Sequence, residues 1–542
     1  MQENEMSSTN QIKNSIVNRA FIEAVCGACL LCGIGFIIQW RYGFGWSDEG
    51  LLWYASQRTF LGEVPILDFY SYDPGRYYWV SLFFHLTGNT GLFSLLAAGA
   101  AFGATGLASI WYAMVKADTP WKIRLTCASL IVVALGFPRH KVYEQSLSLI
   151  LCALIFFTLT NINNARQWFI FGFATGIAAF IGRNHGVFFA ASFILVALYM
   201  LLSKRRNLLP SSTAWFVTGV VAGYSPMLTM IAFQPGFLEA FIHSLLGTSN
   251  WQLPLPIPFI WVADLSGEIS VDLIQTIAIG MASILIPMIY ILGIYLLLSK
   301  KQGETTYKIV TLMGGCCIAG IPYMHQAFQR ADFSHIAQAT LPSIPAVISL
   351  AYYLALQHKK NISILLLITT FIAVVASWLP AEPAVKYWRL FRAEPPAVSA
   401  VDISGDKFYV DNYQAAVISA VRQAVQKCNI GKNEILAAPH FPGIYALLGA
   451  KAPFWEMYYL YKRPDDFQQS HIRAISNTKL VVLSQEATVD GLESLKLRNT
   501  NSLLVDYLNK TFRALKIKDS PNGIQLLIKD GICIAKSETT EQ

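Results

Sequence analysis

Charged side chains are scarce in this sequence of 542 residues. Only 14% of the residues are Asp, Glu, Lys or Arg, whereas 54% are hydrophobic. Because one soluble core cannot bury so much apolar surface, the composition excludes an ordinary soluble enzyme and indicates an integral membrane protein. No basic low-complexity segment accounts for the net charge of +8. Lys and Arg also fix the topology of membrane proteins, so this charge does not indicate a nucleic-acid partner.

Cysteine is rare as well, with nine residues in the whole chain. Cys26, Cys29 and Cys32 recur at helical spacing in an apolar run. No His or carboxylate accompanies them there, so they are interpreted as small packing residues and not as a metal cluster. Cys428 and Cys533 are the only pair in the last part of the chain, where a disulfide and two free thiols both stay open.

Long apolar runs are plentiful in the first two thirds of the chain. A bilayer is crossed by about 17 to 25 apolar residues, and roughly eleven runs of this kind are predicted as spans. They cover residues 21–39, 90–115, 121–137, 146–160, 168–182, 186–202, 213–232, 272–299, 308–322, 339–356 and 361–379. The fold class predicted for residues 21–379 is therefore mainly α, a polytopic helix bundle.

Basic residues fall on alternate loops of this bundle, which predicts a cytoplasmic N-terminus in a bacterial inner membrane. The polar tail, residues 1–20, has no signal-peptide pattern, so the first span is expected to stay as an anchor. An odd number of spans then places the loop after the first span, and the chain after Leu379, on the outer side. The basic clusters are Lys13 and Arg19, residues 116–124, Arg166, residues 204–206, Lys300 and Lys301, and residues 358–360.

The composition changes after a Pro-rich junction at residues 377–398. Helical periodicity at residues 413–428 and 464–475 alternates with short strand patterns at 434–439, 479–484 and 524–529. Residues 380–542 are therefore predicted as a periplasmic α/β domain. Its aromatic segment, residues 439–464, is expected either to pack on the membrane body or to cover a channel for an acceptor.

The loop after the first span is unusually acidic for its predicted place between two spans. It holds four acids and two arginines: Asp48, Glu49, Asp68, Asp73, Arg58 and Arg76. Ser47 is a good N-cap for a helix that ends at Gly62, and this helix is expected to be amphipathic and to lie on the membrane surface. Neighbouring helical residues point about 100° apart, so only one of the first two acids is expected to face a reacting atom. Asp48 is preferred over Glu49.

Three loops on the predicted outer side carry basic residues at membrane depth. These residues are Arg139, His140 and Lys141, then Arg183 and His185, and finally Arg330 and His335. A single one is interpreted most simply as a snorkelling side chain, but charges at a bilayer edge are costly and usually pair or bind something. Guanidinium forks match phosphate geometry, and Lys supplies a point charge. The predicted ligand of Arg139, Lys141, Arg183 and Arg330 is therefore a membrane-embedded phosphate.

Acids and phosphate-binding cations together suit the transfer of a sugar from a polyprenyl phosphate. A hydroxyl or amine acceptor must lose a proton as it attacks the anomeric carbon, and a carboxylate can accept that proton. The departing lipid phosphate gathers negative charge, which nearby cations stabilise. A single displacement inverts the anomeric configuration.

Three segments resemble a known family. They are the "DEG" that begins at Asp48, "GEVPILDFYSYDPGRYYW" at residues 62–79 and "FATGIAAFIGRNHGVFFA" at residues 173–190. They resemble the GT-C fold membrane glycosyltransferases, especially the branch with the lipid A aminoarabinose transferase and the protein O-mannosyltransferases. The resemblance covers approximately residues 1–210. It implies a polyprenyl-phosphate sugar donor, a base at Asp48 or Glu49, and a membrane body capped by a periplasmic domain.

Other polar residues of the same loops are predicted to bind substrate. They are Asp68, Asp73, Arg76, His140, Tyr143, Glu144, His185 and His335. A divalent cation assists some members of the family, and oxygens of Asp48, Glu49 and Glu144 are candidate ligands, although no ligand spacing establishes a site. The acceptor stays open between lipid A, a glycan intermediate and protein hydroxyls.

Two other classes of function are alternatives. A lipid flippase or solute transporter also has many spans and buried charge, but it would carry a polar path through the whole membrane. A non-catalytic envelope assembly protein would use its C-terminal domain for binding, but it would leave the acidic loop unexplained. Convergence of Asp48 with Arg139, Arg183 or Arg330 on one outward cavity would favour the transferase.

Overall fold

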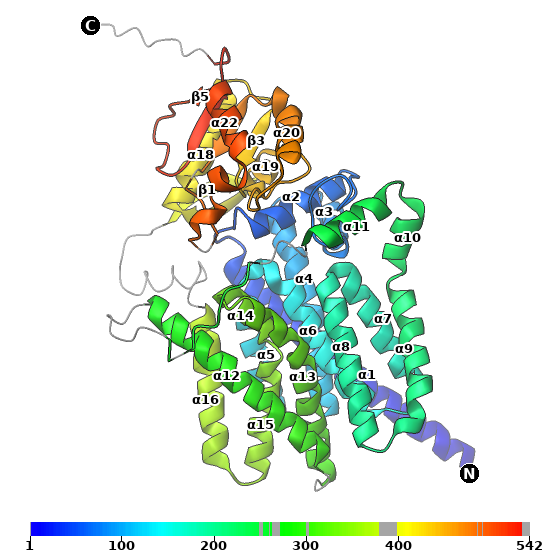
Figure 1. The fold of residues 1–542 in the computed structure, drawn as a ribbon. Helices are drawn as coiled ribbons and strands as arrows, with labels where there is room; N and C mark the ends of the chain where they lie inside the picture. The colour runs from blue at the N-terminus through cyan, green and yellow to red at the C-terminus, as the bar shows by residue number, and fades with distance from the viewer. Residues whose placement is uncertain are drawn as a thin grey trace.

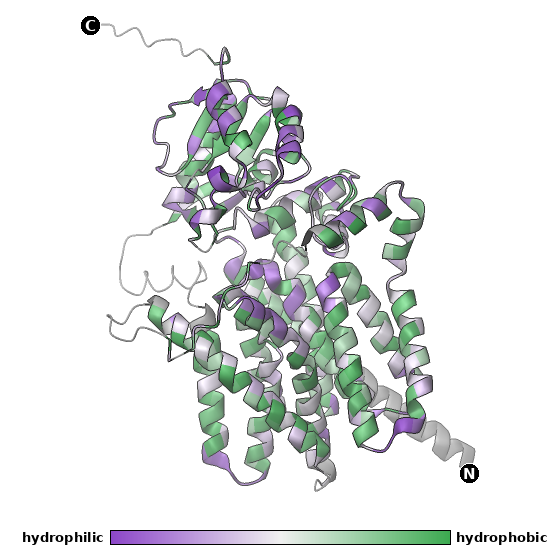
Figure 2. Cartoon of the chain, viewed as in Figure 1, coloured by the Kyte–Doolittle hydropathy of each residue, from purple (hydrophilic) through white to green (hydrophobic). Residues whose placement is uncertain are grey.

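The computed structural model describes residues 2–248, 253–259, 261–262, 271–299, 303–378, 398–484, 486–489 and 491–533. A bundle of helices, here called the body, carries a small α/β domain at one end, and the N-terminus lies at the opposite end (Figure 1). We call the end of the body that meets this C-terminal domain the domain end. Figure 2 shows the lengths of the body helices as mostly hydrophobic, with hydrophilic residues gathered at the ends of the body and over the C-terminal domain.

The body consists of helices that follow one another along the chain. Their bounds are α1 Gln2–Gln39, α2 Asp48–Phe60, α3 Gly75–Thr87, α4 Leu92–Lys116, α5 Trp121–Leu135, η1 Arg139–Lys141, α6 Val142–Thr160, α7 Ala165–Ile181, α8 Arg183–Leu202, η2 Arg206–Leu208, α9 Leu209–Gly223, α10 Ser225–Phe233, α11 Phe237–Thr248, α12 Val271–Leu298, α13 Glu304–Gln329, α14 Phe333–Ala339, α15 Ser343–Leu356 and α16 Lys360–Trp378.

Six helices of the described chain are long and apolar enough to cross a membrane, or up to eight if each of two bent pairs is one span. The bent pairs are α9 with α10, at 52°, and α14 with α15, at 53°. Each of the predicted runs falls on a helix, but α5, α7 and α16 do not meet the length and composition of a full span. The predicted count of about eleven spans is therefore not confirmed.

Close packing of α4 on α6 fixes the start of α6, where several candidate site residues lie. Gly106 of α4 faces the backbone of Ser146, and a Cβ added at Gly106 would come within 2.8 Å of the Ser146 Cα. Small residues of this kind let two helices in a membrane approach closely. The position of η1, directly before α6, is thereby set relative to α1 and α4.

The C-terminal domain has a β-hairpin and a mixed four-stranded sheet. Strands β1 and β2 pair antiparallel, and the larger sheet has the order β3-β4-β6-β5, in which β3 and β4 are parallel and the other pairs antiparallel. The bounds are β1 Val398–Ile403, β2 Asp406–Asp411, α18 Asn412–Lys427, β3 Ile435–Ala438, α19 Pro442–Leu448, α20 Asp465–Ala474, η3 Ile475–Asn477, β4 Leu480–Leu483, η4 Glu493–Leu495, α21 Leu497–Thr500, α22 Ser502–Thr511, β5 Phe512–Ala514 and β6 Gln525–Lys529.

The helices and strands predicted for this domain are confirmed as α18, α20, β3, β4 and β6. The predicted boundary between body and domain, and the Pro-rich junction, lie outside the described residues. Cys428 and Cys533 form a disulfide that joins the end of α18 to the chain after β6. The other seven cysteines are free thiols.

Helix α2 does not have the exposed polar face expected of the predicted amphipathic helix. Ten of its thirteen residues are buried, because α2 packs against α3 in the body and against α19 of the C-terminal domain. Ser47 precedes the helix but makes no side-chain capping bond. Part of the cover of α2 therefore comes from α19 of the C-terminal domain.

Hydrogen bonds to the backbone fasten the C-terminal domain to the loop around α2. The Gly443 amide donates to the Trp46 carbonyl at 2.9 Å, and the Tyr70 amide donates to the Trp455 carbonyl at the same distance. The Trp455 indole donates to the Ile66 carbonyl at 2.9 Å. Since backbone groups on both sides are satisfied in this way, the two parts meet in one defined arrangement.

Gly50 is a point of close approach between α2 and α19. A Cβ at this position would lie 2.5 Å from the Gly443 amide nitrogen and 2.7 Å from the Gly443 Cα. We expect Gly50→Ala to weaken the docking of the C-terminal domain by about 1–3 kcal/mol, as overpacking usually does. Thermal unfolding in detergent, with protease sensitivity of the junction, measures this. Gly33→Ala in α1 is the matched control, because no atom lies within 4 Å of the added Cβ. Equal melting of the two variants would contradict the expectation.

Candidate active site

Asp48, the first residue of α2, lies where the body meets the C-terminal domain. Its Oδ1 accepts a hydrogen bond from the Tyr458 hydroxyl at 3.0 Å. Its Oδ2 lies 3.6 Å from the His140 Nε2. The side chain keeps 45% of its surface exposed. The carboxylate is therefore held by one hydrogen bond, lies near His140 and is open on another side.

The surroundings keep Asp48 ionised. Desolvation in the interface acts to raise its pKa, but the charges of His140 and Lys141 and the hydrogen bond from Tyr458 outweigh this effect, so the pKa lies below its usual value. The charge of His335 acts in the same direction. An open carboxylate that is ionised at neutral pH is able to accept a proton.

Glu49 points elsewhere and is only 5% exposed. Its Oε2 accepts hydrogen bonds from the Gly45 amide at 2.8 Å and from the Arg139 Nη2 at 3.2 Å. Arg139 also donates to the carbonyls of Tyr42 at 2.8 Å and Gly43 at 2.7 Å. This guanidinium thus fastens the link between α1 and α2 to η1. Its donors are engaged by the protein, which argues against the predicted binding of a donor phosphate.

Asp73 of the loop and Glu144 of α6 pair with arginines predicted to bind phosphate or substrate. The Arg183 Nε lies 3.0 Å from the Asp73 Oδ1, and the Arg183 amide donates to the Asp73 Oδ2 at 2.7 Å. The Arg76 Nη1 donates to the Glu144 Oε1 at 2.9 Å, with both side chains buried. Without its partner, each of these charges would be unpaired in a region of low dielectric constant. The two ion pairs therefore hold the loops in their packed arrangement.

Arg330 and His335 share a carboxylate that the sequence analysis did not single out. The Asp332 Oδ2 accepts from the Arg330 Nε at 2.6 Å and lies 2.8 Å from the His335 Nδ1. Despite desolvation, the hydrogen bond from His335 and the charges of His335 and Arg330 lower the pKa of Asp332 to about 2. The signal in the sequence was an Asp three residues before His335, at the N-cap of α14.

The remaining predicted residues lie apart from the Asp48 carboxylate or carry structural contacts. Asp68 is exposed and accepts from the Val64 amide at 2.6 Å within its own turn. The His185 Nδ1 lies 3.0 Å from the Tyr323 hydroxyl in the packed interior. Tyr143 is buried, and its hydroxyl has no hydrogen-bond partner among the described residues.

Lys141 is different from the arginines predicted with it. It is half-buried, and in the described parts of the chain its ammonium makes no hydrogen bond or ion pair. It is close enough to Asp48 for its charge to lower the pKa of that carboxyl. A cation without a protein partner, beside an open carboxylate, is available to an anionic ligand.

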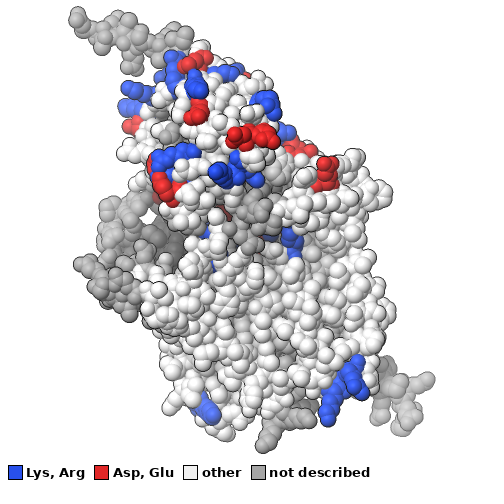
Figure 3. Space-filling view, viewed as in Figure 1, with Lys and Arg blue, Asp and Glu red and all other residues white. Residues whose placement is uncertain are grey.

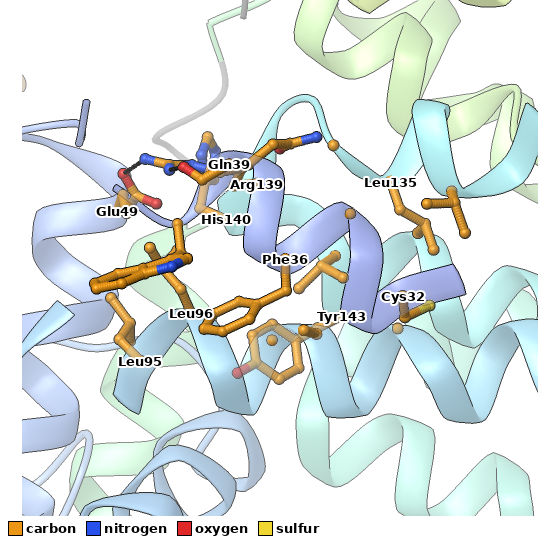
Figure 4. Close-up of a pocket in the computed structure, with 18 of the residues that line it drawn as sticks. Cys32, Phe36, Gln39, Glu49, Leu95, Leu96, Leu135, Arg139, His140 and Tyr143 are labelled. Carbon is orange, nitrogen blue, oxygen red and sulfur yellow. Dashed lines mark hydrogen bonds and ion pairs between the residues drawn. The ribbon is translucent and has the colours of Figure 1, made fainter. Parts of the chain in front are cut away.

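A cleft lies between α1, α4, α5 and the start of α6. Apolar side chains make up most of its lining, including Phe36, Leu96 and Leu135. Figure 4 shows Glu49 and Arg139 at one end, with His140 beside them and Cys32 and Leu135 farther along. Because His140 lines this cleft and also faces Asp48, the polar end of the cleft adjoins the open carboxylate.

The C-terminal domain adds side chains that the sequence analysis did not place in the site. Tyr458 contacts Asp48 directly, and His440 and Tyr461 lie near enough to respond to its charge. Burial lowers the pKa of His440, against the charge of Asp48. The aromatic segment 439–464 was the available signal, and no local pattern linked it to a residue near position 48.

No protein-family model matches the sequence, and no curated protein matches it. Among solved structures, two are similar to the chain. One is the oligosaccharyltransferase of Archaeoglobus fulgidus, at 13% identity and a TM-score of 0.46, covering 85% of this chain and 68% of that one. The other is ArnT from Cupriavidus metallidurans, at 13% identity and a TM-score of 0.46, covering 96% and 98%. At these values neither assigns an activity to this chain.

Arg139 and Lys141 are neighbours that we expect to differ in what they contribute to stability. Arg139→Ala leaves Glu49 buried without its partner, so it is expected to cost about 3 kcal/mol. Lys141→Ala removes no contact within the described residues and is expected to change stability by roughly 0.5 kcal/mol or less. Thermal unfolding of the purified proteins measures both. Adding Glu49→Gln to Arg139→Ala should restore part of the loss, and identical melting of the two single variants would contradict the structural role of Arg139.

Proposed function

We propose that the protein is an inverting glycosyltransferase that moves a monosaccharide from a polyprenyl-phosphate donor to a hydroxyl or amine acceptor. One observation carries the proposal. The ionised and partly exposed Asp48 lies near Lys141, which has no partner among the described residues, and His140, which faces Asp48, lines the polar end of an apolar cleft. A base, a phosphate ligand and a channel for a lipid chain thus adjoin one another.

The cleft suits the donor lipid. Its apolar walls between α1, α4 and α5 suit a prenyl chain, and we assign the phosphate to the side of His140, at the polar end of the cleft, with Lys141 next to it in the sequence. Lys141 takes over the phosphate-binding role that the sequence analysis divided among four cations. The three arginines instead hold the surrounding loops through Glu49, Asp73 and Asp332. The mostly apolar lining is also unlike the polar path that a solute transporter needs.

The chemistry is a single displacement. The acceptor oxygen or nitrogen forms a bond to the anomeric carbon while the bond from that carbon to the phosphate oxygen breaks. The electron pair leaves with the lipid phosphate, whose charge Lys141 stabilises. Asp48 takes the acceptor proton. Because its pKa is lowered, this base is present at neutral pH and is lost only as the pH falls through that lowered pKa.

The oxygen ligands predicted for a divalent cation do not come together, because Glu49 is paired with Arg139 and Glu144 with Arg76. In the described ranges of the chain, no group of three or more His, Cys, Asp or Glu side chains has the geometry to hold a metal ion. We assign the charge on the leaving phosphate to protein cations.

We place the domain end on the outer, periplasmic side of a bacterial inner membrane. Figure 3 shows Lys and Arg at the opposite end of the body, apart from acidic side chains. Exposed Lys204, Arg205 and Arg206 follow α8, and exposed Lys359 and Lys360 lie at the start of α16. An excess of basic residues in such short loops is typical of the cytoplasmic side. The acceptor would then be a lipid, a glycan intermediate or a protein of the envelope.

Asp48→Asn tests the proposed base. Wild type and variant are incubated with radiolabelled polyprenyl-phosphate sugars and a membrane extract, and the transferred label is measured. Loss of a general base is expected to lower transfer by about 10²–10⁴-fold. Asp506→Asn, an exposed residue of α22, is the matched control and should retain the activity of wild type. Equal transfer by the Asp48→Asn variant would remove Asp48 as the base.

Lys141→Ala tests the phosphate site separately. Loss of one charge-assisted contact is expected to raise the KM for the donor by roughly tenfold. The KM for the acceptor should change little, because the cation is assigned to the donor phosphate alone. Titration of each substrate at a saturating level of the other measures the two constants. An unchanged KM for the donor would show that Lys141 does not bind its phosphate.

A further inference from the structure

We propose that Tyr458 is a positioning residue for the Asp48 carboxylate, so that the C-terminal domain completes the active site. This inference rests on the proposed function, because it assigns to Tyr458 a role in the same proton transfer. The two residues are 410 positions apart in the sequence, and their side chains meet at 3.0 Å.

The phenol is held firmly in place. Tyr458 is only 6% exposed, and its ring lies 5.7 Å from the ring of Tyr70, measured between centroids. The ring of Tyr70 in turn packs edge-on against Trp455 at 5.5 Å. Trp455 is fixed by its hydrogen bonds with Tyr70 and Ile66 of the body loop. The hydroxyl therefore reaches Asp48 from a rigid support.

Because of this contact, the two carboxylate oxygens of Asp48 have different neighbours. Oδ1 accepts the hydrogen bond from Tyr458, whereas Oδ2 faces His140 at 3.6 Å. Because Oδ1 already has a donor, Oδ2 is the oxygen left to take a proton from an acceptor. A fixed carboxylate also avoids the loss of orientation that a freely rotating side chain would bring to the reaction.

Several titratable groups surround Asp48, so the effect of Tyr458 has to be separated from theirs. From the body these are His140 and Lys141 of η1, His335 of α14, and Tyr70 and Tyr72 of the loop; from the C-terminal domain they are His440 and Tyr461. Burial and the charge of Asp48 raise the pKa of Tyr458 well above its usual value, so the phenol stays protonated and donates throughout the working range. The hydrogen bond lowers the pKa of Asp48.

Tyr458→Phe removes the hydroxyl and keeps the ring. We expect the acid limb of the kcat/KM profile to move to higher pH, because Asp48 loses a hydrogen bond that favours its charged form. At a pH on that limb, kcat/KM should fall by roughly tenfold, with recovery at higher pH. Tyr413→Phe, an exposed tyrosine in α18 of the same domain, is the matched control and should have the wild-type profile. An unshifted acid limb in Tyr458→Phe would overturn the inference.

A second measurement is independent of transfer. Carbodiimide with an added amine labels carboxyl groups in their protonated form, and mass spectrometry of the α2 peptide follows Asp48 against pH. In Tyr458→Phe, labelling of Asp48 should extend to higher pH than in wild type. Identical labelling curves would overturn the positioning role. A shifted curve from a protein that consumes no donor would support the contact and overturn the proposed function.

A double variant tests whether Tyr458 acts through Asp48. If it does, adding Tyr458→Phe to Asp48→Asn should lower the residual transfer no further. A further loss as large as that of the single Tyr458→Phe variant would assign Tyr458 a role apart from Asp48 and overturn the inference. If the Tyr458→Phe variant has the same unfolding temperature as wild type, its C-terminal domain stays docked.

Discussion

A charge at the edge of an apolar helix bundle needs a partner, and the domain end of this protein is arranged around that requirement. Arg139 pairs with Glu49, Arg183 with Asp73 and Arg76 with Glu144, and each pair joins the loop after α1 to the start of a later helix. Breaking a buried pair leaves an uncompensated charge, which is why these contacts hold the loops so firmly. Asp48 and Lys141 stand out against this background, because the first is open and the second has no partner among the described side chains.

The C-terminal domain forms one side of the site around Asp48. It covers α2 on the side that the body leaves uncovered, and the close approach of Gly443 to Gly50 sets the distance between the two parts. Tyr458 and His440 then come to lie beside a carboxylate of the body. The proposed reaction centre therefore belongs to neither part alone, and the apolar cleft reaches it from within the helix bundle.

Local patterns in the sequence predicted those features that depend on neighbouring residues. The amphipathic period of α18 and the short apolar strands β3 and β4 were predicted near their observed bounds, and the apolar runs fell on helices. The pairing of Arg183 with Asp73 could not be predicted, because 110 positions separate the partners and nothing in either loop specifies the other. The burial of α2 was missed for the same reason, since α19, which packs against it, is remote in the sequence. The preference for Asp48 over Glu49 followed from helix geometry. The contacts of Tyr458 and Asp332 could be found only in the folded structure.

The 410 positions between Asp48 and Tyr458 also have a consequence for the order of biogenesis. A chain is made from its N-terminus, and its parts fold largely in that order. Helix α2 leaves the ribosome early, but the phenol that holds its first residue arrives only when most of the chain has been made. Until then the carboxylate lacks its orienting bond, and the buried face of α2 lacks its cover. An interrupted translation product that inserts its helices normally would therefore carry an unfinished site, and a quality-control protease would find α2 exposed on it.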